Sequence, residues 1–433
     1  MVQPAAADAG GWSHRKLAGA SSAVIATVSR GIAAVSSQDH VKAEIFRGPF
    51  DPGGQPEVAT GQPLELSFFA WNVQGGLSAT KAVLSNPARY RDYWHWPTAS
   101  KLLMTADRIG FDHQVQYGMW SGWGGATAWN SAGLDFATAG TASAVVTERL
   151  NLFSTVHVGY RFHPMHIAKL GASMDFISNG RWGLNVVTGM ILTDFQKFGF
   201  KERPDGPVRY DMADEFVTLL KYLWANERPV DFEGEYYQCY GGYVAPKPVR
   251  KPRPILMNAG QSEAGFDFAC RQADWVFVVP PKGRLEDYAD LVNKAHQLAA
   301  RYGRRVRIGA MCYCVMEDTD EQAQATVDWL EENADTEAIR FYMRQTIGTA
   351  SAMDVDDKDD PYAGLGRDQF MKVALGMTGY QFFGSYETVA EKMRALHEVG
   401  VDNLVIGFFD PQRALQQMEQ HVLPILKRMG LRK

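Results

Sequence analysis

The chain has 433 residues, of which 46% are hydrophobic and 21% charged, the usual balance of a globular protein with a large core. Its net charge of −5 provides no basic field for nucleic acid or an anionic membrane. No apolar run reaches the roughly 18 residues of a membrane span. The four cysteines are too few and too unevenly spaced for a disulfide framework or a zinc site. We therefore expect a cytoplasmic protein that binds neither nucleic acid nor a membrane.

Residues 1–62 differ in composition from the rest of the chain. Ala, Gly and Ser dominate positions 4–38, and positions 48–63 are rich in Pro and Gly. The basic residues before Leu17 faintly resemble a signal peptide, but a sustained apolar core and a clean cleavage pattern are missing. A floppy tail or a misassigned start codon explains the segment better, so we expect 1–62 to be a flexible N-terminal extension.

From residue 65 onward, short β-rich runs alternate with longer helical patterns. The predicted strands are Leu66–Trp71, His113–Tyr117, Leu152–His157, Trp182–Val187, Pro254–Asn258, Trp275–Val279, Val306–Val315 and Asn403–Phe409. The predicted helices are Ala99–Ile109, Leu134–Thr147, Met165–Ile177, Tyr210–Trp224, Glu263–Arg271, Leu285–Arg301, Asp320–Asn333 and Thr388–Val399. Several strands are near-continuous apolar runs, as in parallel sheets covered on both faces.

This alternation predicts an α/β fold, a single closed (β/α)8 TIM barrel over residues 63–433. A doubly wound open sheet is the alternative. Such a sheet normally begins with a glycine-rich turn after the first strand, and here only Gly75 and Gly76 follow it.

Three segments, 75–97, 225–253 and 335–381, are too long for simple connections. Loops that follow barrel strands lie at the catalytic rim. We expect the insertion at 335–381 to be a mobile lid with some helix of its own, although its charge also fits a disordered surface excursion.

Two polar positions are candidates for chemistry. Ser262 follows a predicted strand and precedes a helix, where free backbone N–H groups can bind a phosphate; a plain helix cap is the alternative. Asn185 interrupts the apolar run 182–187 at the end of a strand, so it either faces a ligand or bonds a neighbouring strand. His163 and His166 lack a third ligand nearby, and we expect no metal site.

The stretch from Asp175 to Gly189 resembles the most characteristic segment of luciferase-like two-component flavin monooxygenases. Further similar pieces follow in the same order, at Arg209-Tyr210, Phe232–Tyr237, Pro246–Pro248, Ala259–Ser262 and Gly384–Lys392. The resemblance extends from about Leu64 to Leu426. Within that family the chain is most similar to the pyrimidine monooxygenases, with the dimethylsulfone monooxygenases close behind.

The resemblance implies a bacterial-luciferase-type barrel that receives reduced FMN (FMNH2) from a separate NAD(P)H:flavin reductase. With O2 it would oxidise a small organic molecule through a flavin peroxide, at N5 or C4a. Asn185 would be the catalytic residue beside the flavin ring. The other cofactor-binding residues implied are Gly118 and Met119 facing the ring, Asp194, and Arg209, Tyr210 and Ser262 at the phosphate. The resemblance also implies a homo-oligomer.

Three departures from the pyrimidine enzymes concern the substrate. Those enzymes carry a lysine where this chain has Met119, a glutamate at Asp194 and a tryptophan at Met190. The change makes the pocket more apolar, so we expect a heterocycle, a sulfone or a halogenated aromatic rather than uracil. The alternative functions are an F420-dependent dehydrogenase, which shares the fold, and a non-catalytic flavin-binding protein.

Overall fold

The computed structural model describes residues 40–44, 49–280, 283–346 and 367–433. The chain divides into two compact units, 1–40 and 41–433, and the description below concerns the second. Residues 1–39 of the expected extension and 347–366 of the expected lid lie outside the described residues. No helix in the described ranges is both long enough and apolar enough to cross a membrane.

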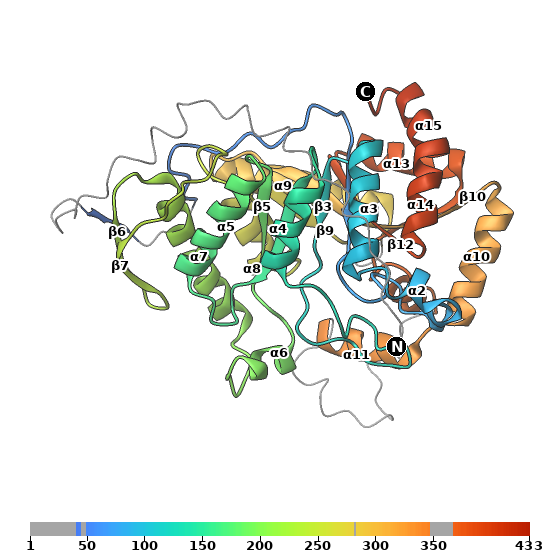
Figure 1. Cartoon of the computed structure of the whole chain (residues 1–433), viewed down its shortest axis with the longest axis horizontal. Coiled ribbons are helices and arrows are strands. Elements are labelled where there is room, and N and C mark those ends of the chain that lie inside the picture. Colours follow the sequence, from blue (N-terminus) through green and yellow to red (C-terminus); the bar gives the residue numbers. More distant parts are fainter. Residues whose placement is uncertain (1–39, 45–48, 281–282, 347–366) are drawn as a thin grey trace, which may run out of the picture. The chain divides into compact units, whose positions relative to one another are not determined.

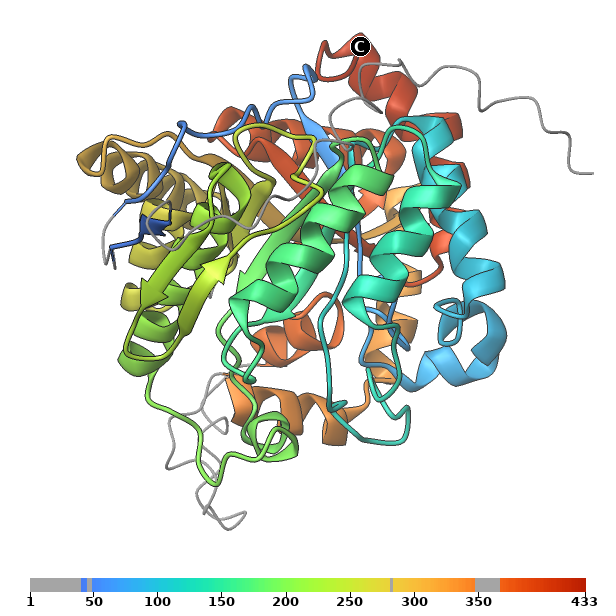
Figure 2. The same ribbon diagram turned by 60° about the vertical axis from the view of Figure 1, so that its left-hand side comes forward.

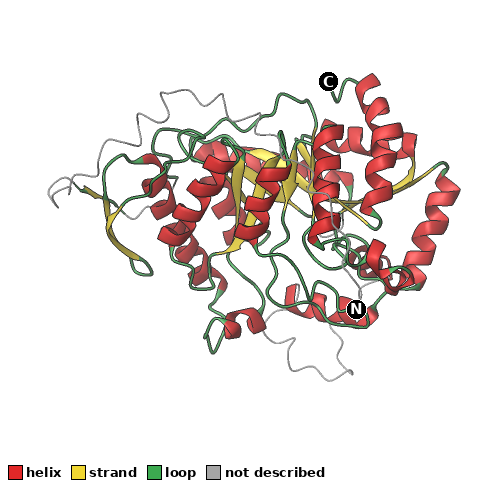
Figure 3. Ribbon diagram, in the orientation of Figure 1, coloured by secondary structure: helices red, strands yellow, loops and turns green. Residues whose placement is uncertain are grey.

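Eight parallel strands form a closed barrel, drawn in yellow at the centre of Figure 3. They are β2 (Glu65–Phe69), β3 (His113–Val115), β4 (Asn151–His157), β5 (Trp182–Val187), β8 (Ile255–Asn258), β9 (Trp275–Val278), β10 (Arg307–Glu317) and β12 (Asn403–Phe408). The barrel closes because β10 pairs with both β9 and β12, and β12 pairs with β2. The predicted TIM barrel is confirmed, and each predicted strand overlaps one of these eight.

Helices follow the strands and cover the barrel (Figures 1 and 3). They include α3 (Trp96–Ile109), α4 (Phe136–Val146), α5 (Pro164–Ile177), α7 (Gly206–Ala225), α8 (Glu263–Gln272), α9 (Leu285–Arg301), α10 (Asp320–Glu332) and α13 (Tyr386–Glu398). The others are η2 (Lys81–Ser85), α2 (Pro87–Tyr90), α6 (Leu192–Lys197), α11 (Thr336–Thr346), α12 (Arg367–Ala374), α14 (Pro411–Gln417), η5 (Met418–Val422) and α15 (Leu423–Arg428). Side-chain caps define several starts: Asp135 accepts from backbone N–H groups of α4, and Ser385 from Thr388 N in α13.

Four further strands lie outside the closed barrel. β1 (Val41–Lys42), β6 (Val230–Glu233) and β7 (Gln238–Gly242) form a small separate sheet. β11 (Tyr380–Ser385) pairs in parallel with the carboxyl half of β10, from Cys312 to Glu317. The amino half of β10 pairs with β9. The sequence did not predict β11, because Gln381 and Gly384 interrupt its apolar pattern and its partner is distant in sequence.

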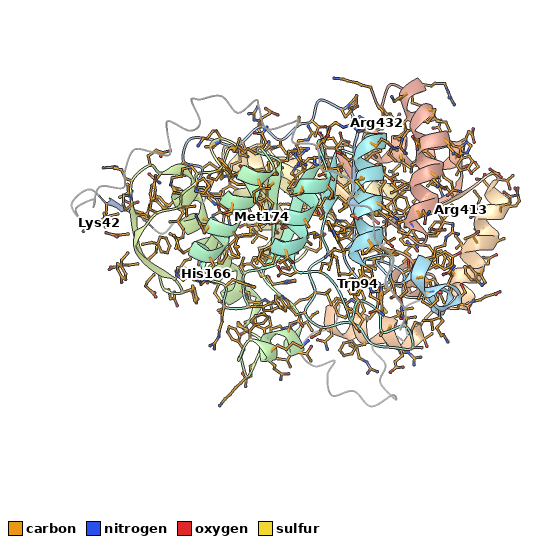
Figure 4. All side chains as sticks on the ribbon, viewed as in Figure 1. Lys42, Trp94, His166, Met174, Arg413 and Arg432 are labelled. Atoms are coloured by element: carbon orange, nitrogen blue, oxygen red, sulfur yellow. The ribbon has the colours of Figure 1, made fainter. Side chains whose placement is uncertain are left out.

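Alternate residues of each strand face the inside of the barrel. Phe69, Phe153 and Met257 belong to one buried cluster, whereas Leu66 and Leu152 belong to the larger cluster between strands and helices. Side chains fill the space between the strands and the helices (Figure 4). Because the barrel strands are parallel, their carboxyl ends lie at the same end of the barrel. Helices α6 and α11 lie side by side at that end (Figures 1 and 2).

Residues 49–62, which we expected in the extension, make specific contacts with the barrel unit. Asp51 accepts hydrogen bonds from Lys221 Nζ at 3.1 Å, Arg253 Nη2 at 2.7 Å and Arg304 Nε at 2.6 Å. All three cationic side chains are buried, and together they hold the pKa of Asp51 well below its usual range. The segment is thus tied to the barrel by a buried ionic cluster.

Candidate active site

Thr155 and Asn185 lie opposite each other near the carboxyl ends of β4 and β5. Asn185 Nδ2 donates to Thr155 Oγ1 at 3.1 Å, and the Thr155 hydroxyl donates to the carbonyl oxygen of Gln116 at 2.5 Å. Asn185 Oδ1 is buried and accepts no hydrogen bond from any described residue. Because a buried acceptor normally has a donor, this oxygen indicates a ligand at this end of the barrel.

Gly118 lies just beyond β3, and its backbone lies against β4. A Cβ atom at Gly118 would lie 2.8 Å from Thr155 Cγ2 and 2.9 Å from His157 Cε1. Any side chain here would therefore displace Thr155 or His157. Met119, the next residue, packs on the buried cluster inside the barrel. Gly118 thus lies against Thr155, the hydrogen-bond partner of Asn185.

His157 is the last residue of β4 and lies two positions after Thr155, on the same face of the strand. Its ring stacks on the Tyr160 ring, with 4.9 Å between centroids and 19° between planes. Burial lowers the pKa of His157 to about 4, so its imidazole is neutral at physiological pH. Sequence reasoning missed both Thr155 and His157, although polar residues alternating along an apolar strand were the available signal.

The second group of expected residues lies at the first turn of α8. Ser262 is the N-cap of this helix, and its hydroxyl accepts from Gly265 N at 3.2 Å. A Cβ atom at Gly265 would lie 2.2 Å from the Tyr210 hydroxyl, so Tyr210 from α7 reaches this turn. The exposed backbone N–H groups of a helix start, a serine and a tyrosine hydroxyl are groups that bind phosphate.

Arg209 precedes Tyr210 on α7. Its Nη1 donates to the Pro204 carbonyl at 3.1 Å, and its Nε is buried with no partner among the described residues. Burial and the nearby Arg203 lower the pKa of the Arg209 guanidinium. Arg209 forms no ion pair with a described residue, so its charge is available to an anion.

Asp194 lies at the start of α6. It is fully buried, and its Oδ2 accepts from the Tyr160 hydroxyl at 3.3 Å. Burial raises the pKa of the Asp194 carboxyl. Tyr160 thus connects Asp194 to His157, through a hydrogen bond on one side and ring stacking on the other.

Aromatic side chains link the loop after β3 to helix α11 of the expected lid. The ring centroids of Trp123 and Tyr342 are 4.9 Å apart, and those of Trp129 and Tyr342 are 5.7 Å apart. The Asp335 carboxylate accepts from both the backbone N and the hydroxyl of Thr127, each at 2.8 Å. The loop after β3 is therefore joined to residues 335–346 by apolar packing and a buried carboxylate.

No group of His, Cys, Asp or Glu side chains suited to a metal ion occurs among the described residues. His163 has a structural role instead. Its Nδ1 accepts from Met165 N at 3.1 Å at the start of α5, and its Nε2 lies 2.9 Å from the Gln238 carbonyl.

Comparison with known proteins agrees with this architecture. A dimethylsulfone monooxygenase from Pseudomonas putida, described as FMNH2-dependent, is 26% identical over 371 residues, covering 85% of this chain and 96% of the relative. A pyrimidine monooxygenase from Variovorax paradoxus is 28% identical over 334 residues, covering 76% and 86%. The structure of a riboflavin lyase shares the fold, with a TM-score of 0.75 at 22% identity and coverage of 86% and 92%. A family model for luciferase-like monooxygenases matches residues 66–403, so the chain belongs to this family.

Proposed function

We propose that this protein is the oxygenase of a two-component system. A separate NAD(P)H:flavin reductase supplies FMNH2, which the barrel uses with O2 to oxidise a small organic molecule. The reaction class follows from the family and is supported by the names of its dimethylsulfone- and pyrimidine-oxidising relatives. The observation in this chain that supports it most directly is the buried, unpartnered Oδ1 of Asn185 at the carboxyl end of β5.

The side chains present fit a flavin mononucleotide. Gly118, Met119 and Asn185 would border the ring, where Asn185 Oδ1 would accept a hydrogen bond from a ring N–H group. Tyr210 and Ser262, at the first turn of α8, would hold the phosphate, and Arg209 would neutralise its charge. Bound FMNH2 supplies the electrons that let one oxygen atom of O2 enter the substrate while the other leaves as water.

The protein's own groups would orient the reactants and exclude water. Asn185, held by Thr155, provides a fixed polar group at the reacting edge. We propose that Asp194 acts on the cofactor side, since its Oδ2 accepts from Tyr160 and its buried Oδ1 has no partner among the described residues. The segment 335–381 would serve as the lid, and its helix α11 already packs on the aromatic loop after β3.

The substrate we propose is a hydrophobic small molecule, such as a sulfone, a heterocycle or a halogenated aromatic. The rings of Trp120 and Phe198, 4.9 Å apart, lie beyond β3 and β5, and Met119 and Met190 add further apolar surface. We further propose a cytoplasmic location and a homo-oligomeric state for the enzyme.

The test is an anaerobic fluorescence titration of the full chain with FMNH2 and, separately, with reduced F420. We expect saturable binding of FMNH2 and little binding of F420. In a separate aerobic assay with a flavin reductase, labelled oxygen from O2 should be incorporated into a substrate. Preference for F420 would change the assignment to a hydride-transferring dehydrogenase. Binding of FMNH2 without any oxygen incorporation across a substrate panel would indicate a flavin-binding protein instead.

A further inference from the structure

His157 has the surroundings of a binding residue rather than of a packing residue. It is only 8% exposed and stacks on an aromatic ring, and no hydrogen bond joins its ring nitrogens to a described residue. Both nitrogens are therefore free to bind a ligand that enters beside Thr155. The Tyr160 ring fixes its orientation by stacking and offers it no hydrogen-bonding group in that contact.

The position of His157 shows which ligand it would meet. Strand alternation puts it on the same face as Thr155, and the Gly118 backbone touches both side chains. Asn185, with its own unpartnered oxygen, is hydrogen-bonded to Thr155 on the next strand. Thr155, His157 and Asn185 therefore form one polar strip at the carboxyl ends of β4 and β5.

Burial lowers the pKa of the imidazole to about 4, so one ring nitrogen is a donor and the other an acceptor at neutral pH. A flavin ring has an edge of alternating N–H donors and carbonyl acceptors, which such a group matches. The hydrophobic substrates proposed above offer few groups of this kind.

We propose that His157 is a further flavin-binding residue, which hydrogen-bonds the polar edge of the flavin ring together with Asn185. This inference rests on the proposed function, since it requires that FMN binds at this end of the barrel. It concerns a residue of this chain that the sequence resemblance did not include.

The experiment compares FMN affinity in matched variants of the full chain. His157→Phe keeps a ring to stack on Tyr160 but cannot hydrogen-bond, and we expect it to weaken FMN binding about tenfold, the loss of one hydrogen bond. His157→Gln keeps a donor and an acceptor and should bind within about threefold of wild type. His166→Phe changes a histidine that α5 exposes (Figure 4) and should leave the affinity unchanged.

A second measurement follows the unmodified protein and uses a variant only to assign its signals. The chain has 10 histidines, and the ring-nitrogen NMR signals of His157 can be assigned by their loss in His157→Gln. FMN should shift these signals. If wild type binds FMN but His157→Phe binds equally well, or the His157 signals do not move, this inference is wrong while the proposed function stands. If wild type does not bind FMN, both are wrong.

Discussion

The Thr155 hydroxyl accepts a hydrogen bond from the Asn185 amide nitrogen at 3.1 Å, so the two side chains hold each other across β4 and β5. This contact fixes which end of the Asn185 amide remains free. Because the nitrogen is occupied, the oxygen is left to face the ligand. The orientation of the proposed catalytic residue therefore depends on a neighbour that contributes only a hydroxyl group.

Replacing Asn185 with Ala should slow the reaction of bound FMNH2 with O2 about 100-fold, the usual loss when one preorganised polar group is removed. Thr155→Val should have a smaller effect in the same direction, because the amide stays but loses its fixed orientation. Stopped-flow reoxidation of the protein-bound flavin measures both rates without a known substrate. A wild-type rate in Asn185→Ala would remove this residue from the reaction.

Ser262 can be tested apart from its role as a helix cap. Ser262→Ala should cost about 1 kcal/mol of stability, whereas Ser262→Gly should cost only a few tenths, since glycine is tolerated at an N-cap. If the hydroxyl also binds phosphate, both variants should weaken FMN binding about tenfold. Equilibrium dialysis and chemical unfolding separate the two effects. Lowered stability with unchanged affinity would leave Ser262 as a cap alone.

Arg209 should contribute to FMN affinity through its charge. Arg209→Met removes the charge and keeps most of the apolar stem, and we expect at least about tenfold weaker binding of FMN. Binding of riboflavin, which has no phosphate, should be unaffected. Isothermal titration with both ligands checks this, with Arg284→Met on the exposed start of α9 as the control. Equal losses for FMN and riboflavin would place Arg209 away from the phosphate.

Acid should destabilise the protein through His157. Burial lowers its pKa from 6.5 to about 4, so between these pH values the unfolded chain binds a proton that the folded protein does not. The free energy of unfolding therefore falls as pH falls through this window, by up to about 3 kcal/mol. Urea unfolding of wild type and His157→Gln at pH 7 and pH 4.5 measures the difference. If the free energy of unfolding changes equally with pH in wild type and in His157→Gln, His157 makes no such contribution.

Asp51 should be essential for stability even though it precedes the first barrel strand. Asp51→Ala would leave Lys221, Arg253 and Arg304 buried with too little negative charge, at a cost of about 3 kcal/mol. Glu419→Ala removes one partner of an exposed ion pair with Arg108 and should leave the unfolding midpoint unchanged. Equal midpoints in the two variants would mean that the contacts of Asp51 are dispensable.

The barrel could be predicted because several of its strands are nearly uninterrupted apolar runs, such as 275–279 and 403–409, separated by amphipathic helices. Strand β11 could not be predicted, because it pairs with β10, and helices α10, α11 and α12 separate the two strands in the sequence. The same holds for Tyr210 and Gly265, which meet only through the packing of α7 against α8.

Asn185 was found as a single amide in an apolar strand, whereas Thr155 and His157 were overlooked. Their strand also carries Ser154, so polar residues occur on both of its faces and the alternation does not single out Thr155 and His157. The ionic cluster around Asp51 was also missed, because the composition of 48–63 suggested a loose segment. Burial of charge by distant partners leaves no local pattern in the sequence.

The long strand β10 has one further consequence. Its carboxyl half is where the insertion with α10, α11 and α12 departs, and it is also where β11 brings the chain back. Both ends of this insertion are therefore anchored to a single strand, and the barrel closes independently of it through β9 and β12. In evolution, such a segment can be lengthened, shortened or exchanged to suit a new substrate while the flavin-binding scaffold is retained.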